Sequence, residues 1–364
     1  MPEKNNKTTF NPNEPAGKDA NIFGLPYTEN ESALILLPIP WEATVSYATG
    51  TAEGPEAIFE ASKQVDLYDP IYADGWKQGI YMRKIDKAIK KMSRDNRKLV
   101  EKLINHLTGT EKMKQNALDK AYDNVNKSSI GLNKYIHNQT KQLLGRNKLV
   151  GLVGGDHSTP FGYIKALAEY YAGQPVGVLQ FDAHCDLRKA YEGFTYSHAS
   201  VMYNVLAETQ ISKLTQVGIR DYCNEEQEFI EMNKSRVNVF FDADIKRSLF
   251  CGESWHTVCK QIIDTLPDLV YISFDIDALD PKLCPNTGTP VPGGLEFDQA
   301  VYLMNMLTDC NKKIIGFDLN EVAPGTNDWD ANVGARLLYK MCTIALKSRS
   351  RSEASNKSVR NEKK

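Results

Sequence analysis

The sequence predicts an α/β fold: a three-layer α/β/α sandwich with a mostly parallel central sheet and a helical insertion. Apolar strand candidates alternate with amphipathic helix candidates along most of the 364 residues. The strand candidates are continuous apolar runs, which is typical of parallel strands that are buried on both faces. Polar motifs follow three of these strands, at the edge where sheets of this class bind their ligands.

Ala33–Pro40 is the first strand candidate, and the Gly54-Pro55 pair after it predicts a helix start, since proline suits a first helical turn. The later strand candidates are Lys148–Gly154, Val176–His184, Leu214–Arg220, Val237–Asp242, Leu269–Asp277 and Ile314–Asp318. The amphipathic helices expected among them are Phe161–Tyr171, Ala199–Ala207, Trp255–Leu266, Phe297–Thr308 and Gly334–Leu346.

We expect one catalytic domain over residues 26–346, with a helical insertion at 84–145. The insertion is rich in Lys and Asn and has apolar residues such as Leu99 and Leu103 at helical spacing. A lid, an oligomer contact and an ordinary surface hairpin are all compatible with this pattern. Residues 1–25 are expected to be flexible, and the basic segment 347–364, which has few apolar residues, is expected to be disordered.

Composition excludes several classes of protein. A net charge of −2 gives no basic surplus for a nucleic-acid partner. No apolar stretch approaches the ~20 residues that span a bilayer, so we expect no membrane partner. The first residues lack the apolar core of a signal peptide, and the seven cysteines are scattered without a Cys-x-x-Cys pair. Reduced thiols in a cytoplasmic enzyme are therefore expected.

Three short motifs carry most of the chemical information. They are GGDHS at Gly154–Ser158, FDAHCD at Phe181–Asp186, and SFDIDALDP at Ser273–Pro281. In an extended strand, side chains two residues apart share a face and lie about 6.5–7 Å apart. Asp182, His184 and Asp186 are therefore expected on one face, with Cys185 on the other. Two histidines and four carboxylates could converge in this way: His157, Asp182, His184, Asp186, Asp275 and Asp277.

These residue types predict a two-metal hydrolytic site. A carboxylate-rich set with two imidazoles and no thiolate suits Mn²⁺ better than a structural zinc, although Ni²⁺, Co²⁺ and Fe²⁺ are compatible with it. Two ions about 3.5–4 Å apart would share a water molecule and lower its pKa. Each motif alone has a simpler explanation, such as a capped turn or helix start. All three in one chain favour metal binding.

The three motifs resemble the signatures of the ureohydrolases, the family of arginase, agmatinase and guanidinobutyrase. Further segments are similar to that family: Gly50–Ile58, Thr287–Leu295 and Asp318–Pro324. The resemblance spans roughly residues 33–345. It implies two ions with two bridging carboxylates, Asp182 and Asp275. The other ligands would divide into one pair for each ion, His157 with Asp186 and His184 with Asp277.

The same resemblance implies catalytic roles for three residues. A metal-bridging hydroxide would attack a guanidinium carbon that Glu321 holds, and urea would be released. Asp186 would pass a proton to the departing nitrogen, and His198 would exchange protons with solvent at the cleft mouth. Taken alone, His198 suits a helix start and Glu321 suits a helix cap or a surface loop.

The substrate is less well defined by the sequence. The loop 187–197 should line the cleft mouth, where Arg188 or Lys189 would favour a guanidino acid such as guanidinobutyrate. Glu192 would instead favour an amine such as agmatine. Aromatic residues near the motifs would suit guanidine itself if they narrow the pocket: Trp41, Tyr47, Tyr191, Phe194 and Tyr196. The resemblance also implies a homo-oligomer, a trimer or a hexamer.

Two alternatives remain open. Asp186-Leu187-Arg188 resembles formimidoylglutamase, a relative that acts on a C=N bond but typically lacks the histidine found here as His198. A metal-binding protein that has kept the fold without turnover belongs to a different class. Urea release from a panel of guanidino compounds distinguishes these hypotheses.

Overall fold

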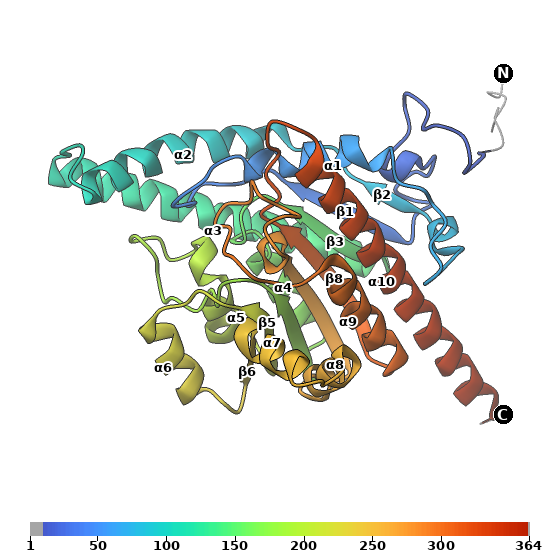
Figure 1. The fold of residues 1–364 in the computed structure, drawn as a ribbon. Coiled ribbons are helices and arrows are strands. Elements are labelled where there is room, and N and C mark those ends of the chain that lie inside the picture. Colours follow the sequence, from blue (N-terminus) through green and yellow to red (C-terminus); the bar gives the residue numbers. More distant parts are fainter. Residues whose placement is uncertain (1–9, 363–364) are drawn as a thin grey trace, which may run out of the picture.

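The computed structural model describes the backbone of residues 10–362 and the side chains as far as residue 354. Its centre is an eight-stranded, all-parallel sheet between two layers of helices, which confirms the predicted α/β/α sandwich (Figure 1). The strands are β1 Leu34–Ile39, β2 Ile80–Met82, β3 Leu149–Gly154, β4 Val176–Phe181, β5 Lys213–Ile219, β6 Val237–Phe241, β7 Leu269–Asp275 and β8 Lys313–Asn320. Their order across the sheet is β2-β1-β3-β8-β7-β4-β5-β6.

Helices cover both faces of the sheet. One layer contains α1 Gly54–Ser62, α7 Asp242–Phe250, α8 Trp255–Asp264, α9 Phe297–Asp309 and α10 Trp329–Glu362. The other layer contains α3 Gln115–Gly145, α4 Phe161–Tyr170, α5 Val201–Glu208 and α6 Asn224–Met232. The helix α2, Lys87–Leu107, packs along α3.

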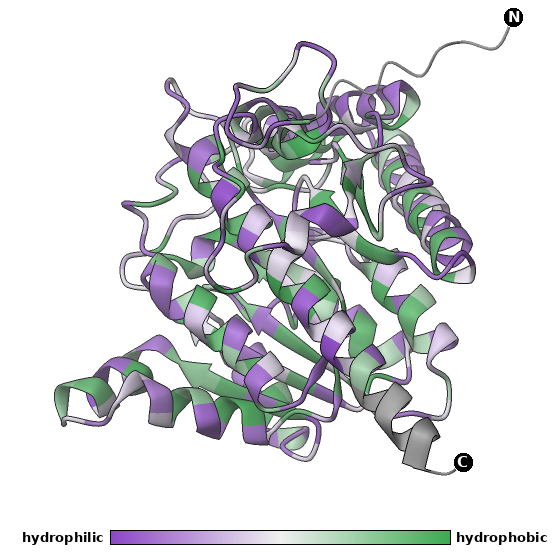
Figure 2. Ribbon diagram, turned by 90° about the vertical axis from the view of Figure 1, so that its right-hand side faces the viewer, coloured by the Kyte–Doolittle hydropathy of each residue, from purple (hydrophilic) through white to green (hydrophobic). Residues whose placement is uncertain are grey.

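The continuous apolar strands follow from this double cover. In β1, Leu34 and Leu36 belong to the core beneath one helical layer, whereas Ile35 and Leu37 belong to the core beneath the other. Both sets must therefore be apolar. The helices alternate apolar and polar residues along their length, because one side of each meets the sheet (Figure 2).

The strand order brings the three motifs together. β7 and β8 are the last strands in the chain, yet they lie between β3 and β4. The carboxyl ends of β3, β8, β7 and β4 are consequently neighbours, at the place in the sheet where open α/β folds bind ligands.

The strands end earlier than the sequence suggests. The predicted strands Val176–His184 and Leu269–Asp277 stop at Phe181 and Asp275, so most of the candidate ligands lie in loops. The expected alternation on a strand face is therefore wrong for residues 182–186. Asp186 has φ of 55°, which is incompatible with an extended strand.

Sequence patterns also missed short elements. The three-residue β2 pairs with β1 at the sheet edge, and it is too short for a periodic signal.

The stretch 84–145 contains α2 and α3, which run side by side and project beyond the body of the sheet (Figure 1).

The predicted loose ends are more ordered than expected. Residues 1–9 lie outside the described residues, but Ile22, Phe23 and Leu25 are buried in the core. The sequence pattern did not predict the burial of these three residues, because polar residues surround them in the sequence. At the other end, α10 continues past Lys347, and buried Ser348 accepts a hydrogen bond from the Ile314 N–H at 2.9 Å. The prediction that disorder begins at Lys347 is therefore wrong.

Within the part of the chain that the structure describes, no helix is both long enough and apolar enough to cross a membrane.

Candidate metal centre

His157 enters the site from the loop that follows β3. Gly155 lets this loop pass against the backbone of Trp41, because a Cβ at Gly155 would lie 1.8 Å from the Trp41 carbonyl oxygen. The Asp156 N–H donates to that same oxygen at 2.7 Å. The second glycine of the GGDHS motif is thus needed for steric reasons. The tight packing of this loop against Trp41 fixes the His157 imidazole at the carboxyl end of the sheet.

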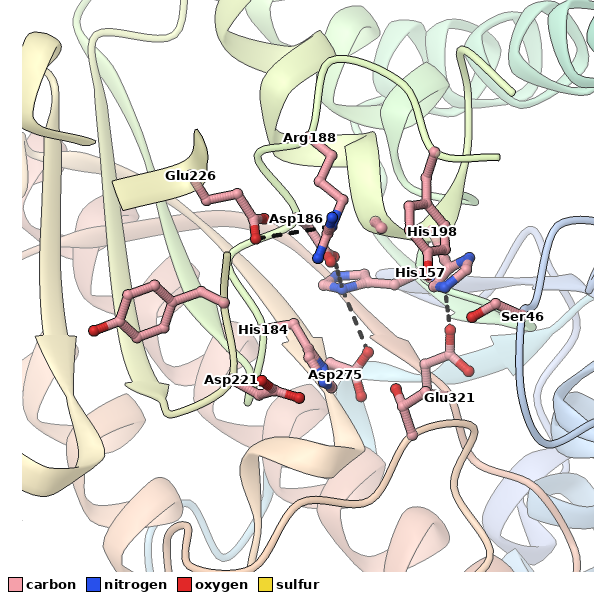
Figure 3. Close-up of a pocket in the computed structure, with 14 residues that line it drawn as sticks. Ser46, His157, His184, Asp186, Arg188, His198, Asp221, Glu226, Asp275 and Glu321 are labelled. Atoms are coloured by element: carbon pink, nitrogen blue, oxygen red, sulfur yellow. Dashed lines mark hydrogen bonds and ion pairs between the residues drawn. The ribbon is translucent and has the colours of Figure 1, made fainter. Parts of the chain in front are cut away.

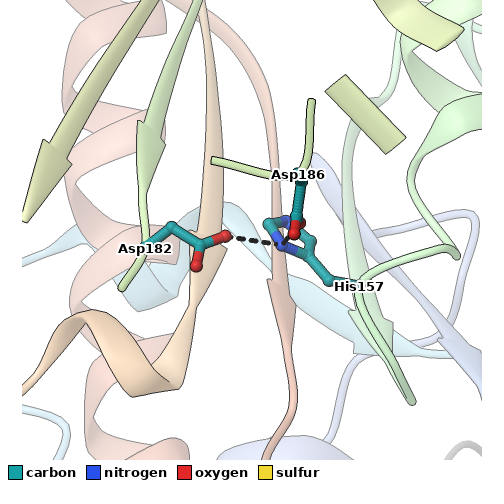
Figure 4. Close-up of side chains that lie close together, drawn as sticks. All are labelled: His157, Asp182 and Asp186. Carbon is teal, nitrogen blue, oxygen red and sulfur yellow. Dashed lines mark ion pairs between the residues drawn. The ribbon is translucent and has the colours of Figure 1, made fainter. Parts of the chain in front are cut away.

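Two groups of potential ligands share one carboxylate. The first consists of His157, Asp182 and Asp186, and the second of Asp182, His184 and Asp277. His157 Nδ1 lies 2.9 Å from Asp182 Oδ2 and 3.0 Å from Asp186 Oδ2 (Figure 4). His184 Nδ1 lies 3.0 Å from Asp277 Oδ2. The structure therefore gathers these residues into two adjacent clusters joined at Asp182.

Asp275 lies beside the first cluster, with its Oδ2 3.4 Å from His157 Nδ1. It is the last residue of β7, and Asp277 follows in the short helix η5, Ile276–Ala278. All six side chains predicted as ligands therefore lie at one end of the four central strands.

Protein donors hold the carboxylates of the site in place, and at Asp277 they leave one oxygen free. Asp277 Oδ1 accepts the Ala183 N–H at 2.9 Å, whereas its buried Oδ2 has no hydrogen-bond partner among the described residues. Asp275 Oδ1 accepts the Asp277 N–H at 2.9 Å. Asp182 accepts hydrogen bonds at both oxygens, from Gln180 Nε2 at 2.7 Å and from the His184 N–H at 2.7 Å. These bonds fix the carboxylates before any ligand arrives.

The hydrogen-bond partner of His157 Nε2 determines that Nδ1 is the ring nitrogen that faces the cluster. Ser273 Oγ donates to Asp318 Oδ1 at 3.1 Å and lies 2.9 Å from His157 Nε2. Because the serine proton is committed to Asp318, His157 Nε2 is the donor, which leaves Nδ1 to face the cluster, where a cation could replace its proton. Chains of this kind orient metal-ligating histidines.

We expect Ser273→Ala to weaken metal binding about 10- to 100-fold, because the imidazole loses the partner that fixes its orientation. Metal titration followed by calorimetry measures this change. Ser128→Ala, at a partly exposed position of α3, is the control, and equal affinity of the two variants would contradict the assigned role.

The charges of the cluster favour cations. Burial, together with neighbouring Asp182, raises the pKa of Asp186 to about 7. Burial and neighbouring Asp277 raise the pKa of Asp275 well above its ordinary range. Moreover, His157 Nδ1 lies close to carboxylate oxygens without the geometry of a hydrogen bond to them. Although burial alone would lower it, the pKa of His157 is raised well above its ordinary value by neighbouring Asp182 and Asp186. A divalent cation could take the place of the Nδ1 proton and relieve the repulsion among these crowded carboxylates.

A cavity of about 170 Å³ opens next to the clusters and contains the two other predicted catalytic residues. Glu321 follows β8, and its Oε1 accepts the His157 N–H at 2.8 Å. Its Oε2 is buried without a hydrogen-bond partner among the described residues. Burial and neighbouring Asp156 raise the pKa of Glu321 well above its ordinary value. This free oxygen is suited to a cationic ligand.

His198 lines the same cavity from the short helix η4, His198–Ser200. Its ring is partly exposed to the cavity, and burial with neighbouring His184 lowers its pKa to about 3. An imidazole that exchanges protons with solvent, as the sequence predicts for His198, works best with a pKa near neutral, and this lowered pKa does not favour that role. His198 is a neutral base at physiological pH.

The outer part of the cavity contains residues that sequence patterns did not identify, among them Asp221 and Glu226 (Figure 3). Arg188 lies here, with its Nε 3.8 Å from Glu226 Oε2 and its guanidinium carbon 4.9 Å from the centre of the Tyr191 ring. Glu226 also accepts the N–H groups of Leu187 and Cys223 at 3.1 and 3.0 Å. Glu226 lies 38 residues after Arg188 in the sequence, so no local sequence pattern could predict that the two side chains pair.

The aromatic residues named from the sequence do not all reach the cavity. Tyr191 lines it, whereas Trp41 and Phe194 are buried elsewhere and Tyr47 is largely exposed. Cys185 is fully buried in the core beneath one helical layer, away from the clusters.

Comparisons with known proteins agree with this architecture. The sequence matches the arginase family over residues 32–343. An N(1)-aminopropylagmatine ureohydrolase of Synechocystis sp. is 29% identical over 314 residues, which cover 85% of this chain and 88% of the relative. An agmatinase of Neisseria meningitidis is 29% identical over 322 residues, which cover 87% and 88% of the two chains.

Solved structures show the same fold. The agmatine ureohydrolase of Thermoplasma volcanium superposes with a TM-score of 0.68 at 22% identity, covering 90% of this chain and 94% of that chain. A formimidoylglutamase of Bacillus subtilis gives a TM-score of 0.62 at 20% identity, covering 89% of each chain. The family match spans most of the sequence and all the residues of the two clusters. The chain therefore belongs to the arginase family and is a hydrolase of the ureohydrolase type.

Proposed function

We propose that this enzyme releases urea from a small guanidino compound at a centre of two divalent cations, with Mn²⁺ as the ion best suited to the ligands. The observation that carries the proposal is the pair of ligand clusters that share Asp182, next to the unpartnered oxygen of Glu321. One cation would lie between His157, Asp182 and Asp186, and the other between Asp182, His184 and Asp277, with Asp275 beside both. When bound, the two cations would activate a shared water molecule for attack on the guanidinium carbon.

Glu321 would bind and orient the guanidinium. Its Oε1 is held by the His157 N–H, so its Oε2 can accept a charge-assisted hydrogen bond from the substrate. A cation close to this buried carboxyl group would favour its ionised form. The guanidinium carbon is then held near the ligand clusters, which replaces a bimolecular encounter with a positioned one.

Two side chains of the cavity can move protons. Asp186, whose Oδ2 lies 3.0 Å from His157 Nδ1, would pass a proton to the departing nitrogen. His198 would relay protons between the cavity and solvent by hydrogen bonding, since it lines the cavity and is partly exposed.

The outer cavity favours a substrate with a cationic tail. The buried carboxylate of Glu226 partly neutralises Arg188, so Arg188 is poorly available to a substrate carboxylate. Asp221 adds a second negative charge at the mouth and has no ion pair within the described part of the chain. This surplus attracts an amine and repels a guanidino acid. Agmatine is therefore the proposed substrate type, and guanidinobutyrate and guanidine are the poorer alternatives.

We expect the Mn²⁺-loaded enzyme to release urea from agmatine with a higher kcat/KM than from 4-guanidinobutyrate or guanidine. Asp221→Asn should lower kcat/KM for agmatine by about threefold to tenfold, with a smaller effect at high salt. Asp268→Asn, at the opposite end of β7, is the matched control. A preference for guanidinobutyrate, unchanged in the Asp221 variant, would contradict the assignment of the outer cavity.

The same assay tests the alternatives. Release of formamide from formimidoylglutamate, without urea from any guanidino compound, would favour the formimidoylglutamase activity. Bound metal without any product would favour a non-catalytic member. We also propose, from the resemblance and the reduced cysteines, a cytoplasmic homo-oligomer, a trimer or a hexamer.

A further inference from the structure

We propose that the α2–α3 hairpin sets the shape of the cavity mouth, with Asn126 and Phe194 as positioning residues for the loop 187–197. The kinetic part of this inference rests on the proposed function, whereas its structural part does not. The loop matters because it carries Arg188 and Tyr191, which line the cavity, and because His198 follows it directly.

The tip of the loop is a tight turn that separates its two faces. Tyr191 and Phe194 exchange backbone hydrogen bonds of 3.2 and 2.8 Å. Glu192 and Gly193 between them have φ of 51° and 86°, which is the geometry of a two-residue hairpin turn. Tyr191 lines the cavity, whereas Phe194 belongs to a different set of contacts.

Phe194 is part of the core of the α2–α3 hairpin. Phe194 lies 49 residues beyond Gly145, the last residue of α3, and only 1% of its surface is exposed. It packs in a small apolar cluster with residues of both helices, namely Val100, Leu103, Leu118, Ala121 and Val125. The Tyr122 ring lies 5.5 Å from the Phe194 ring. A Cβ at Gly193 would come within 2.6 Å of Tyr122, so the turn lies directly against α3.

Asn126 holds the backbone on both sides of Phe194. Its Oδ1 accepts the Thr195 N–H at 3.1 Å, and its Nδ2 donates to the Gly193 carbonyl at 3.4 Å. The Asn126 amide thus supplies hydrogen bonds that a neighbouring strand would otherwise supply to the outer edge of this short hairpin. The aromatic anchor fixes the depth of the loop, and the amide fixes its register.

The same hairpin also holds a second loop that lines the cavity, the loop of Val45 and Ser46. Arg97 of α2 donates to the Val45 carbonyl, next to Ser46, which lines the cavity. Ser93 Oγ accepts the Glu42 N–H at 3.0 Å. The loop 187–197 and the loop of Val45 and Ser46 therefore attach to the same pair of helices. A shift of the hairpin would move both of these loops.

The direct test compares Asn126→Ala with Asn124→Ala, a matched change at an exposed position two residues earlier on α3. Trypsin can cut the loop after Arg188 and Lys189, and Lys189 is exposed. We expect Asn126→Ala to be cut there at least about fivefold faster than the unmodified protein, because local opening becomes easier. Asn124→Ala should be cut at the unmodified rate, as measured by mass spectrometry of timed digests.

The second readout is the division between KM and kcat. For the guanidino substrate, Asn126→Ala should raise KM about tenfold and change kcat less than about threefold, because it displaces the mouth and spares the clusters. Phe194→Leu should retain most of the loop protection, and Phe194→Ala should lose it. Cleavage and kinetics of Asn126→Ala that equal those of Asn124→Ala would overturn the inference. Faster cleavage in an enzyme that releases no urea would support the hairpin's role and reject the proposed function.

Discussion

Replacing Asp182 with asparagine is expected to lower urea production by about 10³-fold or more and to reduce the content of both bound ions. Asp182 is the only residue common to the two ligand clusters found among the described residues. Its fully buried carboxylate supplies an oxygen to each, and an uncharged amide can replace neither. Asn has nearly the same volume, so we expect the fold to remain.

Metal analysis by mass spectrometry and a urea assay on the same preparation check this prediction. Asp280→Asn is the matched control, because Asp280 belongs to the SFDIDALDP motif yet pairs with Lys282 at the surface. A variant at Asp182 that keeps full activity after removal of metal would contradict the two-cation centre.

Glu321→Gln is expected to lower kcat/KM about 10²- to 10³-fold while the metal content stays unchanged. The glutamine oxygen can still accept the His157 N–H, so the loop should keep its shape. The group that faces the cavity, however, becomes an uncharged amide that cannot pair with a guanidinium. Loss of one partner from a buried, charge-assisted pair costs about 2–5 kcal/mol, which corresponds to a change of this size.

Steady-state kinetics with agmatine, together with metal analysis, measure this effect. Glu111→Gln, in the exposed connection between α2 and α3, is the control. Loss of metal in the Glu321 variant would show that the residue supports the clusters rather than the substrate, and this would contradict its assigned role.

The fold could be predicted largely from local patterns. Continuous apolar runs such as Leu269–Asp275 indicate strands covered on both faces, and the structure confirms that layout. The order of the strands could not be predicted in this way, because the position of β8 beside β3 depends on packing between distant segments. Short elements such as β2 give too few residues for a periodic signal.

The candidate site shows the same division. Motif spacing predicted which side chains the structure gathers into the two clusters. The reason given for it, alternation along a strand, does not hold, because β4 ends before residues 182–186. The pairing of Arg188 with Glu226 was not predictable, since it depends on where α6 begins relative to the loop after β4. The lowered pKa of His198 likewise depends on burial, which no local pattern records.

The position of β7 and β8 at the middle of the sheet has a consequence for biosynthesis. A ribosome synthesises β3 and β4, with the candidate ligands that follow them, well before it reaches Leu269. The sheet joins β3 to β4 only through β8 and β7, which lie between them. Contacts so distant in sequence form late and slowly. We therefore expect His157 and Asp182 to come together only after β7 and β8 have been synthesised, so that the proposed cations would bind late in folding.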